Sequence, residues 1–283
     1  MVLMKCARPA RRLVTAVRLR RGAAACAVCA LLLVSGWSAG KAADSASAPR
    51  HVSTASSSSA VPSRAASPKS ADKNKTAASK SGGSEKILNV KNIQQTPELQ
   101  SGCEVTAAAI LLDYFGYDVT KTDLLPFLPN DDDFFETDGK QYGPNPWKTF
   151  AGSPDTDRYG CYAPVIANTL NDYLLAVDGS HVAYNLTGLS ADKLYKLVDA
   201  GLPVVVWVTI GMAEPSGGRS WYLTDTGENY QWIAKEHCMV LIGHTATQAV
   251  FSDPYDARGT VSYDKSLFEK RYQQLYSQAV TMR

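Results

Sequence analysis

The most reactive side chain that this sequence offers is the thiol of Cys103. The surrounding Ser101-Gly102-Cys103-Glu104 has the Ser-x-x-Glu form of a capping box, which predicts that a helix begins here with Cys103 as its second residue. Unpaired N–H groups and the helix dipole place partial positive charge at a helix N-terminus, and this favours thiolate over thiol. A thiolate is the nucleophile of cysteine hydrolases, although a cysteine at such a place is more often a buried core residue.

His237 is the histidine best placed to act as a general base. The chain has four histidines, and His237 opens the apolar run His-Cys-Met-Val-Leu, which predicts a strand. An imidazole at a strand start that faces a helix N-terminus can take the proton of a thiol. His181 and His244 are expected in a surface loop and a solvated turn, and His51 lies in a segment that we expect to be disordered.

Asp253 is the candidate for the acid that would orient the imidazole. It follows a predicted strand over residues 249–252 and precedes Pro254. An antiparallel pairing with the strand of His237 would bring its carboxylate beside the ring, where an acid fixes the tautomer and steadies the imidazolium. The alternative is an ordinary Asp-Pro turn.

Gln95, eight residues before Cys103, could supply an oxyanion-hole donor. Its side-chain N–H groups could act together with the backbone N–H of Cys103. Gln94 and Gln100 are rivals that spacing alone does not exclude.

The remaining cysteines after residue 84 are Cys161 and Cys238. Cys238 should point away from His237 into the core, and Cys161 is either a second buried thiol or its disulfide partner. No Cys-x-x-Cys or His-x-x-x-His spacing occurs after residue 84, so we expect no metal and no cofactor.

Charge divides the chain of 283 residues into two parts. Residues 1–84 hold 14 Lys and Arg and two acids, whereas residues 85–283 hold 15 Lys and Arg and 25 Asp and Glu, a net charge of −10. Phosphate binding requires a basic face, so the acidic part argues against a nucleic-acid partner.

The N-terminal part predicts export. Residues 1–43 have a basic lead and then the apolar stretch Ala23–Val34, which is typical of a signal peptide; an uncleaved membrane anchor is the alternative. Residues 44–84 are rich in Ser, Ala and Lys and should form a disordered tether. A basic tether suits contact with an anionic envelope, or it serves as a plain spacer. We therefore expect a secreted or cell-surface protein.

Residues 85–283 predict one α+β domain, with helices first and a run of strands later. The helix at 105–115 is apolar on nearly every side and should be the buried central helix. Residues 130–160 are rich in Pro, Gly and Asp and predict a long ordered loop that forms one wall of a cleft, with Trp147 and Phe150 as its apolar candidates. Further helices are expected at 120–128, 164–177, 190–200 and 265–275, and strands at 204–210, 221–223, 230–233, 237–242, 249–252 and 278–281.

The motif around Cys103 also carries a family resemblance. The segment Gln95–Ala107 (QTPELQSGCEVTA) resembles the Gln-x-Pro-Glu-Leu-Pro-x-Gly-Cys-Glu signature of bacterial proteins similar to the bacteriocin-leader-processing cysteine peptidases, family 39 of the papain-like cysteine peptidases. Gln100 stands where Pro is usual. Shorter motifs extend the resemblance over 88–281, at 114–117, 143–146, 162–166, 201–204, 236–241, 252–254 and 277–280.

This resemblance implies a papain-like fold in which a helical part packs on an antiparallel β-sheet. It implies Cys103 as nucleophile, His237 as base, Asp253 as orienting acid and Gln95, rather than Gln94, as oxyanion donor. The expected function is an exported cysteine hydrolase, a monomer that cleaves a peptide or another amide bond through a thioester. The alternatives are an amidase or endopeptidase acting on peptidoglycan stem peptides, and a non-catalytic surface module that binds a ligand on the same fold.

Overall fold

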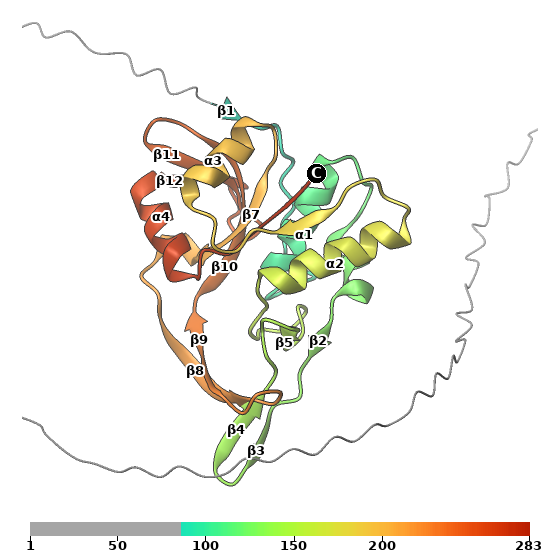
Figure 1. The fold of residues 1–283 in the computed structure, drawn as a ribbon, viewed down its shortest axis with the longest axis vertical. Helices are drawn as coiled ribbons and strands as arrows, with labels where there is room; N and C mark the ends of the chain where they lie inside the picture. The colour runs from blue at the N-terminus through green and yellow to red at the C-terminus, as the bar shows by residue number, and fades with distance from the viewer. Residues whose placement is uncertain (1–85) are drawn as a thin grey trace, which may run out of the picture. The chain divides into compact units, whose positions relative to one another are not determined.

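The computed structural model describes residues 86–283, so the expected export signal (1–43) and tether (44–84) lie outside the described residues. The described part is an antiparallel sheet with helices on both faces (Figure 1). It is the papain-like α+β fold that the sequence predicts. Among these residues, none of the helices combines the length and apolar character needed to cross a bilayer.

The main sheet has seven strands in the order β12-β11-β10-β7-β13-β6, with β1 paired to one end of β10. Every pairing in it is antiparallel. Its strands are β1 (Lys86–Ile87), β6 (Ala183–Asn185), β7 (Val204–Thr209), β10 (Glu236–His244), β11 (Gln248–Ser252), β12 (Thr260–Asp264) and β13 (Ala279–Met282).

The central strand β7 explains how the layers are held together. Its residues are all buried, and their side chains alternate between the two faces of the sheet, as the period of a strand requires. Val205 and Trp207 pack with α1 (Cys103–Tyr114) and α2 (Ala163–Ala176). Val206 and Val208 pack on the other face with α3 (Ala191–Asp199) and α4 (Lys265–Gln274). The continuous β-branched run is thus the sequence of a strand covered on both sides.

Helix α1 is buried, as predicted, but the predicted capping box is wrong. The helix begins at Cys103 with Gly102 as its N-cap, and no side chain caps it. The hydroxyl of Ser101 donates instead to the carbonyl oxygen of Thr156, and Oε1 of Glu104 accepts the N–H of Cys161 at 2.8 Å. Ser101 and Glu104 bond to the 156–161 segment instead of capping the helix, because α1 starts against this segment rather than in solvent.

Residues 130–160 are not the plain loop that we expected. They contain the short strands β2 (Asn130–Asp131), β3 (Phe135–Thr137), β4 (Lys140–Gly143) and β5 (Phe150–Ala151). β4 pairs in parallel with β8 (Ser216–Leu223), which pairs with β9 (Asn229–Ala234), so a four-stranded sheet β3-β4-β8-β9 extends away from the main one (Figure 1). Two 3-10 helices, η1 (Lys121–Phe127) and η2 (Ile210–Met212), complete the elements; η1 replaces the helix expected at 120–128.

Candidate active site

The start of α1 places the Cys103 thiol at the edge of a cleft. A Cβ on Gly102 would lie 2.5 Å from the Cβ of Leu99, so only glycine lets the preceding turn approach this closely. Cys103 is 6 % exposed, and the backbone N–H of Cys238, at the start of β10, donates to its Sγ at 3.4 Å. The thiol therefore lies at the N-terminus of α1 and accepts a hydrogen bond from a backbone N–H of the main sheet.

His237 and Asp253 form a buried pair beside this thiol. Nε2 of His237 lies 2.8 Å from Oδ1 of Asp253, and the two residues are 2 % and 3 % exposed. The pairing of β10 with β11 brings the ends of the two strands together, as the sequence predicts. Oδ1 of Asp253 also accepts the N–H of Tyr255 at 2.8 Å, which fixes the carboxylate in place. With Nε2 engaged in this way, Nδ1 is the ring nitrogen left for the thiol.

The ionisation of the three groups fits a thiolate–imidazolium pair. Hydrogen bonds from Cys238, and then from His237, lower the pKa of Cys103 well below its usual value despite its burial. Burial disfavours the imidazolium, but hydrogen bonds to Asp253 and Cys103 outweigh it and raise the pKa of His237 to about 10. Burial also opposes the charge of Asp253, yet the hydrogen bond from His237 keeps its pKa low. At neutral pH these directions leave the thiol ionised and the ring protonated.

The other described histidines lie elsewhere. Nδ1 of His181 lies 2.8 Å from the hydroxyl of Tyr117. His244, which we expected in a solvated turn, is instead the last residue of β10, with its Nε2 3.0 Å from Asp199 and its side chain 12 % exposed. Neither contacts Cys103, so His237 is the histidine that the fold brings to the thiol.

Gln95 is the glutamine of the three candidates that is buried at the cleft. It is 3 % exposed and lines the cleft together with Cys103, and its Nε2 donates to the carbonyl oxygen of Gln100 at 2.9 Å. Its second amide hydrogen remains for an oxyanion. Nε2 of Gln94 donates instead to the carbonyl oxygens of Asp253 and Asp256, and Gln100 is exposed.

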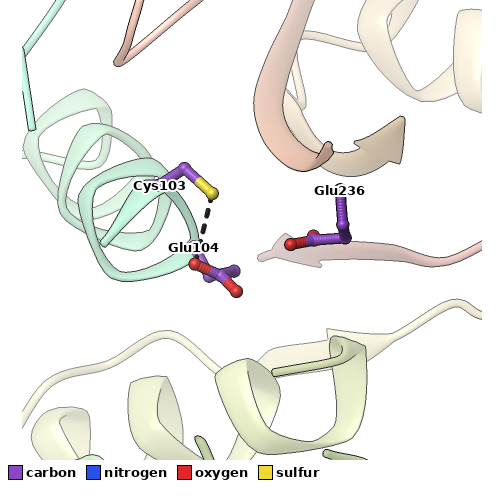
Figure 2. A group of neighbouring side chains, drawn as sticks. All are labelled: Cys103, Glu104 and Glu236. Atoms are coloured by element: carbon purple, nitrogen blue, oxygen red, sulfur yellow. Dashed lines mark hydrogen bonds between the residues drawn. The ribbon is translucent and has the colours of Figure 1, made fainter. Parts of the chain in front are cut away.

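Two buried glutamates adjoin the nucleophile, and our sequence analysis gave them no place in the site. The carboxyl groups of Glu104 and Glu236 lie close to Cys103 (Figure 2), and Oε2 of Glu104 lies 3.2 Å from Sγ. Burial, reinforced by the charge of Cys103, raises the pKa of each carboxyl well above its usual value. This site therefore favours the neutral form of both carboxyl groups. The signal that could have found them is an acid directly beside each of the residues Cys103 and His237, at the start of an apolar run.

The ligand atoms of Cys103, Glu104 and Glu236 all lie within 4.8 Å of one another, the one potential metal-ligating group among residues 86–283. Its two carboxyl groups would have to lose their protons before they could bind a cation.

Cys161 and Cys238 are both buried free thiols, so the disulfide that we left open is not present in the structure. Cys238 packs between the sheet and α1, as predicted, and burial raises the pKa of both thiols. Neither is therefore a rival nucleophile.

The cleft has a volume of about 1060 Å³ and contains Cys103, His237 and Gln95 in its lining. The 130–160 segment forms part of its wall, as expected, but through Phe134 and Tyr159. The side chains that we expected there, Trp147 and Phe150, lie elsewhere: Trp147 packs on Tyr162, and Phe150 is fully buried in β5.

Comparison with known proteins agrees with this geometry. The sequence profile of the peptidase C39-like family matches residues 87–280. The chain belongs to this family. It is 30 % identical over 203 residues to the uncharacterized protein YvpB of Bacillus subtilis (strain 168). The aligned region covers 71 % of this chain and 77 % of YvpB. The crystal structure of a Bacillus anthracis protein assigned to the C39-like peptidases matches with a TM-score of 0.62 and 33 % identity, over 70 % of this chain and 97 % of that one. Membership supports a peptidase-type hydrolase.

Proposed function

We propose that this protein is a cysteine peptidase that cleaves a peptide or another amide bond through a thioester on Cys103. The observation that carries the proposal is the buried His237–Asp253 pair, with Nε2 and Oδ1 2.8 Å apart, beside the Cys103 thiol, whose pKa is lowered. A cysteine that serves only the core needs neither an oriented imidazole nor a depressed pKa. For the same reason the pair speaks against the non-catalytic binding module.

In this mechanism the Cys103 thiolate attacks the carbonyl carbon of the scissile bond. The backbone N–H of Cys103 and the free amide hydrogen of Gln95 would stabilise the oxyanion that forms. The imidazolium of His237 then donates its proton to the leaving amine, and Asp253 keeps the ring oriented. Neutral His237 next takes a proton from water, which attacks the thioester and releases the acid product.

The test is a peptide mixture incubated with the protein and read by mass spectrometry. We expect new peptide termini and an acyl-enzyme adduct on Cys103, both absent from Cys103→Ala. Asp253→Asn should slow turnover by several orders of magnitude, as loss of an orienting acid does in triads. Purified peptidoglycan stem peptides form a second arm, because an amidase acting on them would use the same residues. Absence of cleavage and adduct in both arms would refute the enzyme assignment.

We further propose that residues 1–43 direct export and that residues 44–84 tether the catalytic domain outside the cell. The basic lead, the apolar stretch and the Ser-rich composition support this proposal. N-terminal sequencing of the protein recovered from its host tests it. A chain that retains Met1 and stays in the cytoplasm would contradict it.

A further inference from the structure

The cleft around Cys103 differs in charge from the rest of the domain. Residues 85–283 hold 25 acids and 15 Lys and Arg. The charged residues of the cleft lining show the opposite balance: three cations and two acids, namely Arg158, Arg219, Lys235, Asp157 and Glu236. Glu236 is buried, and burial raises the pKa of its carboxyl and so favours its neutral form. Asp157 also lines the cleft, and Asp132 pairs with Arg158 from outside the lining.

Two of these cations are held at the cleft by irregularities of the backbone. Arg219 lies in the register shift between Gly217 and Ser220, where β8 bulges against β9. A bulge of this kind re-aims a side chain and often lies next to an active site. Arg219 is exposed, and it forms no ion pair with any residue of the 86–283 part.

Lys235 is the single residue between β9 and β10, two positions before His237. Its φ of 62° lies in the left-handed region, which residues other than glycine seldom adopt, and the N–H of Ile210 holds its carbonyl oxygen at 2.9 Å. Lys235 is also exposed and, within the described residues, has no ion-pair partner. A strained conformation thus presents an ammonium group on the His237 side of the cleft.

The third cation lies on the side of the nucleophile. Arg158 donates its backbone N–H to the hydroxyl of Ser101 at 3.3 Å, next to Cys103. Its guanidinium pairs with Asp132 at 2.6 Å and lies over the ring of Phe134, and its side chain is still 47 % exposed. Asp132 balances the charge of Arg158, so the unpaired positive charge of the cleft lining comes from Arg219 and Lys235, while Phe134, Tyr159 and Trp232 supply apolar surface.

From this placement we infer that the enzyme selects peptides that carry carboxylates near the scissile bond. The inference rests on the proposed peptidase function. The shared chemistry is a polyanionic peptide with apolar side chains, whether an acidic protein segment or a stem peptide with free carboxylates. Exposed charge pairs typically change binding by about two- to fivefold each, so Arg219 and Lys235 together should favour such a substrate by about tenfold.

The experiment begins with cleavage sites found in a proteome-derived peptide mixture, which should be enriched in Asp and Glu near the cut bond. Matched peptides with those acids changed to Gln or Lys should lose about tenfold or more in kcat/KM, and the preference should shrink at high salt. The double variant Arg219→Glu/Lys235→Glu should abolish or invert the preference. The control Lys193→Gln removes an exposed cation of α3, outside the cleft, and should leave it unchanged.

Binding to Cys103→Ala, followed by fluorescence anisotropy, keeps the inference testable apart from turnover. Tighter binding of the acidic peptide to this inactive variant supports it. Cleavage or binding that is indifferent to peptide charge overturns it while the peptidase assignment stands. Preferential binding without any cleavage by the unmodified protein overturns the peptidase assignment instead. Stem peptides with free and with amidated carboxylates, run in parallel, distinguish the two sources of substrate.

Discussion

The ionisation of Cys103 makes a sharp prediction for its alkylation by iodoacetamide. An ordinary thiol with a pKa of about 8.5 is about 1 % ionised at pH 6.5 and about half ionised at pH 8.5, so its labelling rate rises about 50-fold over this interval. The pKa of Cys103 is lowered well below its usual value, while that of His237 is raised to about 10. The thiolate–imidazolium pair should therefore persist across the whole interval, and the rate should change by less than about twofold.

The perturbation is His237→Ala, which removes the positive charge and hydrogen bond beside the thiol but leaves the thiol buried. The pKa of Cys103 then rises, and labelling should regain a rise of at least about tenfold between pH 6.5 and 8.5. Rates come from intact-protein mass spectrometry with peptide mapping of the labelled site. Cys161→Ser is the control, because Cys161 is buried with a raised pKa, and it should leave the profile flat. A 50-fold rise in the unmodified protein, or superimposable profiles with and without His237, would refute this account of the site.

Two further changes test the surroundings of the nucleophile. Glu104→Ala leaves the N–H of Cys161 without its acceptor and should lower the free energy of unfolding by about 1–3 kcal/mol in urea titrations, whereas Glu104→Gln, which keeps an oxygen acceptor, should cost less. Equal losses for the two variants would argue against the hydrogen bond from the N–H of Cys161 as the source of the stability. Gly102→Ala forces a methyl group to within 2.5 Å of Leu99, which should cost about 1–3 kcal/mol and slow labelling of Cys103 even where the protein remains folded. Unchanged stability and labelling would show that the turn adapts freely.

The sequence predicted most of what one motif and one hydrophobic pattern can encode. The apolar runs at α1, β7 and β10 are long enough to be recognised as buried elements, and the order of Gln95, Cys103, His237 and Asp253 follows the family motif. Most of the elements that the sequence analysis missed are short. Strands such as β2 and β5 have two residues each, and β6 has three, so no periodicity distinguishes them from loop. Their partners are distant in sequence, and only the packed chain supplies them.

Glu104 shows a second limit of local patterns. Three residues after a serine and at a helix start, a glutamate is normally a surface capping residue. Here the chain near Cys161 packs on that turn, and a carboxyl that should face water is fully buried. A pattern that spans four residues cannot include a partner 57 residues away. The prediction that Trp147 and Phe150 line the cleft was wrong for a related reason. The sequence identifies an aromatic side chain but does not show which way it faces.

The division of the site between a helix and a sheet has a consequence for the reactivity of Cys103 before the protein folds. Cys103 belongs to α1, whereas Cys238, 135 residues later, and the His237–Asp253 pair belong to the sheet. Until these layers meet, the thiol has neither its N–H donor nor its imidazolium, and it reacts as an ordinary cysteine. The chain must therefore be made at least through Asp253 before the pair can form beside the thiol. A shorter nascent chain lacks the residues on which the proposed peptidase mechanism depends.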